Sequence, residues 1–288
     1  MGETPIPFFM CARQGAPTTR WKGICSLLLG IHDFINAQPL LGPLMKRASG
    51  AGLEIRTDSP ARLADQLSSG KLDMAMIPAI EYLKQADRFR MVPNVSISSR
   101  NKVGTVLLIS KVPLNAIRSL ALDNRSRTSI ALFHILYSNV IPEGLKLAQR
   151  DPDPEKMLNH HDAALIIGDQ ALGIRKEGVS IYDLSEEWFN RTGKTFVHAV
   201  IAVREGVKVE GGIIQTLLDA KQEGLQNLDT IAQAQANKTG HPVFLLRDYL
   251  KNKIRYNFGE EEMEGLMHFQ SLCHEFGLVP KKFPLRFV

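Results

Sequence analysis

The sequence predicts an α/β protein of two lobes, joined by two crossings of the chain, that close a cleft on a ligand. Three observations predict this fold: short strand and helix units recur, a middle section leaves the first lobe and later returns to it, and the C-terminal part is helical. A chain of 288 residues with 44% hydrophobic content is long enough to bury two cores. We place lobe 1 at residues 22–110 and 196–288, lobe 2 at 111–195, and a flexible extension at 1–21.

The clearest strand–helix–strand unit lies at residues 53–83. An extended LEIRT segment leads to Ser59 and Pro60, which suit the N-cap and the first residue of a helix, and Gly70 ends that helix. LDMAMI then reads as a buried strand that ends at Pro78. The two strands of such a unit run parallel, and ligands bind beyond their carboxyl ends. We therefore expect Pro78 at the cleft.

The middle and end of the chain continue this pattern. VPNVSIS and VGTVLLIS flank the polar loop SRNK as a hairpin-like pair, and the strands at 119–123 and 163–167 are each followed by a polar junction and a helix. FVHAVIAV, at 196–203, is long enough to return the chain to the first lobe. Further helices are expected at residues 210–237, 242–252 and 259–276.

Charge and cysteine content restrict the partners and the compartment. The net charge of +5 is modest, because 35 basic residues are interleaved with 30 acidic ones. That balance favours a small anionic ligand over nucleic acid, and no recognition-helix or zinc-finger pattern is present. Cys11, Cys25 and Cys273 form no CxxC motif, and no run reaches the ~18 apolar residues of a membrane span. We predict a cytoplasmic protein without membrane insertion and without a metal.

The junction DNRSRTSIALFHIL, at residues 123–136, is the richest candidate binding site. A strand ends there, and the first helical turn contains Thr128 and Ser129, with Arg125 and Arg127 in the loop before it. Free backbone N–H groups at a helix N-terminus bind anions. The alternative interpretation is an ordinary Ser or Thr cap beside solvated arginines.

Three other junctions carry polar side chains. Gly168 permits close backbone approach, and Asp169 either caps the next helix or meets a ligand hydroxyl. Thr105, at the start of a strand, either exposes its hydroxyl to the cleft or is structural. In GIHDFINAQPL, at 30–40, Asn36 is a cap or an amide that both donates to and accepts from a ligand. GxSxG, P-loop and GxGxxG motifs are absent.

Taken together in order and spacing, the motifs resemble one family, chorismate dehydratase, the first enzyme of the futalosine route to menaquinone. The resemblance covers nearly everything from about residue 24 to residue 280. The matching segments are GIHDFINAQPL, TDSPARLADQLSSGKLDMAMIPAIEYL, ISSRNKVGTVLLISKVPLNAIRSLALDNRSRTSIAL, DAALIIGDQAL, YDLSEEWFNRTGKTFVHAVIAVR and YLKNKIRYNFGEEEMEGLMHF. It implies a periplasmic-binding-protein type 2 fold with a ligand cleft between the lobes. Thr195, Ile201 and Thr105 depart from the Pro, aromatic and Ser residues that the family usually has.

The resemblance also implies a hydro-lyase reaction that needs no metal or redox cofactor. The substrate is the dianion chorismate, and the products are 3-[(1-carboxyvinyl)oxy]benzoate and water. Under this hypothesis Thr128 and Ser129 hold one carboxylate, with Arg127, Gly168, Asp169 and Pro78 as further substrate contacts. Thr105 adds a hydroxyl from the other lobe, and Asn36 orients the enolpyruvyl carboxylate or the leaving hydroxyl. The base is either His32 or the substrate's own enolpyruvyl carboxylate.

Two other functions compete with this one. A non-catalytic receptor for an anionic metabolite would have the same fold, because fold alone says nothing about turnover. The sister enzyme of the pathway, 1,4-dihydroxy-6-naphthoate synthase, also shares the fold. Its Ser-Pro-Cys-Pro-Asn-Asp-type motif is absent where HDFINAQPL stands.

Overall fold

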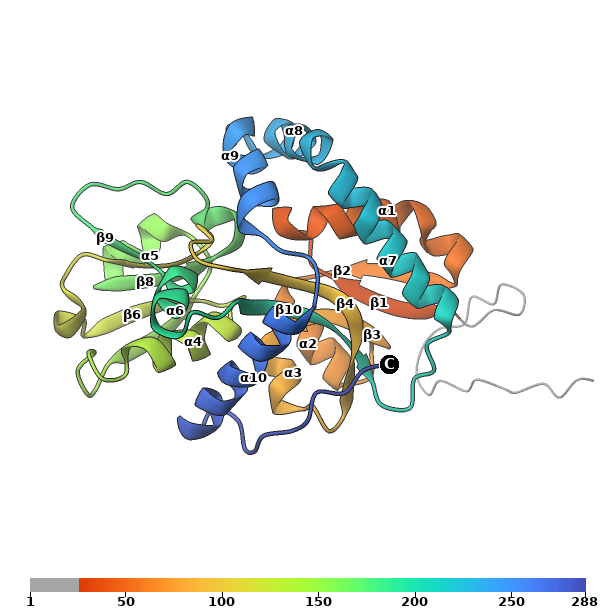
Figure 1. Ribbon diagram of the computed structural model, residues 1–288. Helices are drawn as coiled ribbons and strands as arrows, with labels where there is room; N and C mark the ends of the chain where they lie inside the picture. Colours follow the sequence, from red (N-terminus) through yellow and green to blue (C-terminus); the bar gives the residue numbers. More distant parts are fainter. Residues whose placement is uncertain (1–25) are drawn as a thin grey trace, which may run out of the picture.

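The computed structural model describes residues 26–288, which form two five-stranded sheets with helices around each (Figure 1). The first sheet has the order β2-β1-β3-β10-β4 and the second the order β7-β6-β8-β5-β9. The strands of the first sheet are β1 (Leu27–Ile31), β2 (Leu53–Thr57), β3 (Met74–Pro78), β4 (Phe89–Ser99) and β10 (Phe196–Arg204). Those of the second are β5 (Val106–Ser110), β6 (Ser119–Asp123), β7 (Lys146–Arg150), β8 (Ala163–Ile167) and β9 (Ser180–Asp183). Each sheet is the centre of one lobe.

The helices flank both sheets. Those that precede β10 are α1 (Gln38–Arg47), α2 (Pro60–Ser68), α3 (Ala79–Lys84), α4 (Thr128–Tyr137), α5 (Pro154–His160) and α6 (Leu184–Thr192). Those of the C-terminal part are α7 (Gly211–Gln226), α8 (Leu228–Thr239), α9 (Val243–Asp248) and α10 (Glu260–Glu275). Figure 1 shows α1 and α7 on one side of the first sheet and α2, α3 and α10 on the other. None of the helices within 26–288 is long and apolar enough to cross a membrane.

The predicted strand–helix–strand unit is confirmed. Ser59 is the N-cap of α2, Pro60 its first residue, and every residue of β3 is buried. β1 pairs in parallel with both β2 and β3, so it lies between the two strands of the unit. The carboxyl ends of β1 and β3 therefore meet at one edge of the first sheet, next to His32 and Pro78.

The predicted hairpin is wrong. β4 pairs with β10, whereas β5 pairs with β8 and β9 in the second sheet. Residues 100–105 between them, with Asn101 and Gly104 at positive φ, carry the chain from one sheet to the other. The sequence analysis placed this crossing after residue 110; because β5 belongs to the second sheet, it comes before Val106.

The C-terminal helices differ in detail from their predicted bounds. The helix expected at 210–237 divides into α7 and α8 at Asn227, which leaves the helical conformation and donates from its side-chain amide to the Glu223 carbonyl at 2.7 Å. The helix expected at 242–252 is α9 followed by a π-helical turn, Tyr249–Lys253. The extension predicted at residues 1–21, together with Cys11 and Cys25, lies outside the described residues. Cys273 is buried in α10 as a free thiol.

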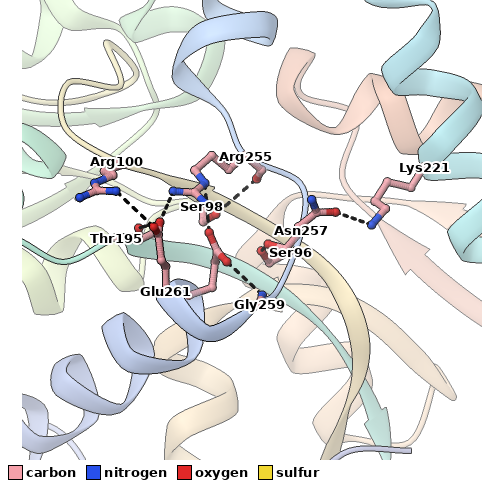
Figure 2. A network of polar contacts seen from close by, with 10 residues as sticks. Ser96, Ser98, Arg100, Thr195, Lys221, Arg255, Asn257, Gly259 and Glu261 are labelled. Carbon is pink, nitrogen blue, oxygen red and sulfur yellow. Dashed lines mark hydrogen bonds and ion pairs between the residues drawn. The ribbon is translucent and has the colours of Figure 1, made fainter.

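A network of polar contacts joins both crossings to α10 (Figure 2). Glu261 of α10 pairs with Arg100, just after β4, at 3.2 Å, and accepts a hydrogen bond from Thr195, just before β10, at 3.5 Å. Arg255 pairs with the same carboxylate, and its backbone N–H donates to the Ser98 carbonyl at 2.8 Å. The two segments that link the lobes are thus tied to one side chain.

Candidate functional site

A cavity of about 570 Å³, including its open mouth, lies between the two lobes. A volume of this size suits a small molecule. Eight of the nine site residues predicted from the sequence line it: His32, Asn36, Pro78, Thr105, Arg127, Thr128, Ser129 and Gly168. The ninth, Asp169, does not line it. The sequence analysis did not name Phe34, Arg125 or His198 as ligand contacts, and these also line the cavity.

Asn36, Thr105 and Tyr249 form a polar cluster at the cavity. Asn36 lies in a 3₁₀ turn, Ile35–Ala37, just before α1, and Tyr249 begins the π-helical turn. The Thr105 hydroxyl lies 3.0 Å from the Tyr249 hydroxyl. Burial raises the pKa of Tyr249 above its usual value, and hydrogen bonding by Thr105 and Asn36 offsets this only in part. The phenol therefore stays protonated and anchors the other two side chains.

The Asn36 amide has an unused acceptor. Its Oδ1 is buried and has no hydrogen-bond partner among the described residues. A buried polar atom without a partner costs about 1–3 kcal/mol. A ligand hydroxyl that donates to Oδ1 recovers this energy, so the cavity favours a ligand with a donor at that point.

The N-terminus of α4 faces the same cavity. No side chain caps this helix, and its first backbone N–H groups have no intrahelical partner. The Thr128 hydroxyl accepts from Ile80 N at 3.3 Å and donates to the His198 carbonyl at 3.4 Å, so it bonds to the first lobe. The Ser129 hydroxyl lines the cavity and has no partner within residues 26–288. Ser129 and the free N–H groups thus remain available to an anion.

Both arginines beside α4 are occupied by protein partners. Arg127 pairs with Asp65 at 2.8 Å and with Glu81 at 3.2 Å, both in the first lobe. Arg125 forms a bidentate ion pair with buried Asp123, and its guanidinium lies 5.0 Å from the centre of the Phe34 ring. Anion binding in the cavity therefore depends more on the end of α4 than on a free arginine.

Two histidines of the first lobe line the cavity. His32 follows β1 and is only 3% exposed, and its Nδ1 has no partner among the described residues. His198, in β10, lies with Nε2 2.8 Å from the Ser99 hydroxyl. Burial lowers the pKa of each to about 4, and at His32 the Asp33 charge opposes this shift. Both are neutral at pH 7. The sequence signal for His198 was its position as a polar residue inside an apolar strand.

These histidines predict a loss of stability in acid. The unfolded chain binds protons at about pH 6.5, whereas the folded histidines bind them only near pH 4. Between these values the unfolded state holds more protons, so the free energy of unfolding falls as the pH falls, by up to about 1.4 kcal/mol per pH unit for each histidine. Urea unfolding at pH 7 and pH 5 measures this. In His198→Gln the difference between the two pH values should shrink, and an unchanged difference would contradict the assignment for His198.

Asp169 holds the backbone of the other lobe. Its Oδ1 and Oδ2 accept from Ile35 N at 3.1 and 3.3 Å. Burial raises the pKa of the carboxyl, while the Ile35 N–H and the Arg125 charge oppose that rise. Gly168 has a φ of +70°, and a Cβ there would lie 3.0 Å from the Phe34 ring. The junction 168–169 thus contacts the turn that contains Asn36. No group of three or more His, Cys, Asp or Glu side chains within 26–288 is placed to hold a metal ion.

Comparisons with known proteins agree with this architecture. Two solved structures cover most of the chain: a protein of Archaeoglobus fulgidus (TM-score 0.73, 14% identity, 88% of this chain and 98% of that one) and the periplasmic aliphatic sulphonate binding protein of Escherichia coli (TM-score 0.60, 15% identity, 92% and 94%). These likenesses confirm the two-lobed, periplasmic-binding-protein-like fold.

Sequence comparison is more specific. Chorismate dehydratase of Thermus thermophilus is 31% identical over 259 residues, which is 84% of this chain and 93% of that protein. The resemblance found in the sequence is therefore confirmed. The family described as menaquinone biosynthesis matches residues 27–275, nearly the whole of the described chain. This protein belongs to the menaquinone biosynthesis family.

Proposed function

We propose that this protein is a chorismate dehydratase that forms 3-[(1-carboxyvinyl)oxy]benzoate and water without a cofactor. The relative from Thermus thermophilus supports the reaction class. The observation that carries the proposal is the pairing, across one cavity, of the uncapped N-terminus of α4 with the Asn36, Thr105 and Tyr249 cluster. The first suits a carboxylate and the second a hydroxyl, and chorismate carries both.

The driving force of the reaction lies in the substrate. The C3 hydrogen of chorismate is γ to the ring carboxylate through a double bond, so its removal leaves an electron pair delocalised toward that carboxylate. This pair then expels the C4 hydroxyl, which leaves as water with the proton that the base took from C3, and the ring becomes aromatic. The protein has to fix the dianion, align the C4–O bond and assist two proton movements.

The residues divide these tasks between the lobes. Ser129 and the free N–H groups of α4 hold the ring carboxylate, where the helix end favours negative charge. Asn36 accepts from the C4 hydroxyl through Oδ1, and Thr105 with Tyr249 fixes that amide. An amide suits this place because it does not titrate.

The substrate's enolpyruvyl carboxylate is the base in this proposal. A histidine with a pKa of about 4 is no stronger a base than an ordinary carboxylate. Neither cavity histidine is therefore a better base than the substrate's own enolpyruvyl carboxylate. His32→Gln and His198→Gln should each lower kcat for chorismate by less than about tenfold, below the range of a lost general base. A loss of 100-fold or more confined to one of them would assign the base to that histidine instead.

Incubation with chorismate tests the function as a whole. Purified protein should produce a new aromatic absorbance and a product lighter than chorismate by one water in mass spectrometry. Protein heated beyond recovery of its circular dichroism serves as the control. Binding of chorismate, seen by calorimetry, without product would instead favour a receptor for an anionic metabolite.

A further inference from the structure

Two contacts between the lobes lie beside the cavity, and they differ in kind. In one, Arg127 of the second lobe reaches Asp65 and Glu81 of the first through ion pairs, and Asp65 is largely exposed. In the other, Asp169 of the second lobe accepts from the backbone of Ile35 in the first, 134 residues away in sequence. The Asp169 contact involves a charged group and holds main chain through two oxygens, whereas the Thr128 hydroxyl contacts main chain of the first lobe at 3.3 and 3.4 Å.

The surface that receives this turn is built into the second lobe. The Arg125 guanidinium is held by Asp123 at 2.7 and 2.9 Å and by the Ile167 carbonyl at 3.1 Å, independently of the first lobe. Phe34 lies over this guanidinium and against Gly168, where a side chain would bring a Cβ within 3.0 Å of the ring. The ring fits because residue 168 has no side chain.

The hydrogen bond from the Ile35 N–H to Asp169 also affects the next residue, Asn36. Ile35 begins the 3₁₀ turn in which Asn36 lies, so a fixed Ile35 N–H holds the backbone from which the Asn36 side chain projects. Asp169 itself does not line the cavity. Its carboxylate accepts instead from the Ile35 N–H, so we expect its effect to pass through the position of this turn.

We propose that Asp169 is a positioning residue, whose carboxylate holds the Asn36 turn against the second lobe and keeps the lobes closed in the absence of a ligand. We name the set Asp169, Ile35, Phe34, Gly168 and Arg125 the Asp169 latch. Its effect on turnover rests on the proposed function, whereas its effect on closure does not. The latch assembles Asn36 of one lobe with Ser129 of the other before substrate arrives, which lowers the ordering cost of binding.

Small-angle scattering and kinetics together test the latch. Without ligand, Asp169→Ala should have a larger radius of gyration than the wild type. Its kcat/KM for chorismate should fall about tenfold or more, as expected for the loss of a hydrogen bond to a charged group. Asp169→Asn keeps an oxygen that can accept from Ile35 and should restore most of both properties. Phe34→Leu should open the protein in the same direction as Asp169→Ala.

Asp65→Ala is the matched control. It removes a carboxylate of the other interlobe contact, leaves Arg127 paired with Glu81, and should change neither the radius of gyration nor the activity. A wild-type radius of gyration in Asp169→Ala would overturn the proposal, as would an Asp169→Asn variant as impaired as the alanine variant. If the wild type does not convert chorismate, only the proposed function is refuted. The scattering comparison still tests whether Asp169 keeps the lobes closed.

Discussion

Replacement of Asn36 by alanine is expected to lower kcat for chorismate by about 100-fold or more, because a reacting group that is misplaced by about 1 Å loses turnover on that scale. The variant removes the buried Oδ1 that has no protein partner and the amide that lies beside Tyr249. KM should change less than kcat, since the carboxylate site at α4 remains. Steady-state kinetics with chorismate measure both constants.

Asn190→Ala is the control for this variant. Asn190 is exposed on α6, away from the cavity, and the same substitution there should leave both constants unchanged. Full activity in Asn36→Ala would remove Asn36 from the mechanism. A rise in KM with unchanged kcat would make it a binding contact that is equally strong in the ground state and the transition state.

Replacement of Gly224 by alanine is expected to destabilise the fold by about 3 kcal/mol or more, at the upper end of the cost of overpacking. An added Cβ at this position in α7 would lie 1.6 Å from the Pro39 carbonyl oxygen of α1. The obstacle is backbone, which cannot rotate away as a side chain can. The two helices must therefore separate, and thermal unfolding should show a much lower Tm.

Gly212→Ala in the same helix provides the comparison. Nothing lies within 4 Å of a Cβ built there, so alanine should be neutral or should stabilise by up to about 1 kcal/mol through its better helix propensity. Equal Tm values for the two variants would show that α1 and α7 are not in close contact. Because Pro39 follows Asn36 by three residues, Gly224→Ala should also reduce activity at temperatures where it remains folded.

Local signals in the sequence were sufficient for part of the fold. Around α2 the cap, the proline and the apolar stripe of the helix all agree, and α2 begins where predicted, although β3 begins at Met74 rather than Leu72. The pairing of β5 was predicted wrongly. Because β5 is buried along its whole length, its sequence has no alternation of apolar and polar residues that could indicate a partner strand. Its real neighbours, β8 and β9, are more than 50 residues away in sequence. Pairing at that distance is decided by packing of the whole lobe.

In the site, too, local sequence motifs identified some residues, while others became evident only from the contacts between distant segments. Thr128, Ser129 and Gly168 follow strand ends, where the rule for α/β sheets places ligands, and they line the cavity as that rule implies. Tyr249 reaches the cluster from the C-terminal helices, which the sequence analysis assigned no role in binding. Asp169 carries a cap-like signal, but what it binds is an N–H of the other lobe. A sequence motif does not reveal which distant backbone group lies within reach of such a carboxylate.

The network of Figure 2 has a mechanical consequence. Because Arg100 and Thr195, one in each crossing, both contact Glu261, the two connections should twist together, about a single axis that passes near α10. The arginine pair is half exposed, and such pairs contribute only about 0–1 kcal/mol. We therefore expect α10, none of whose residues lines the cavity, to couple the two connections when the cavity opens.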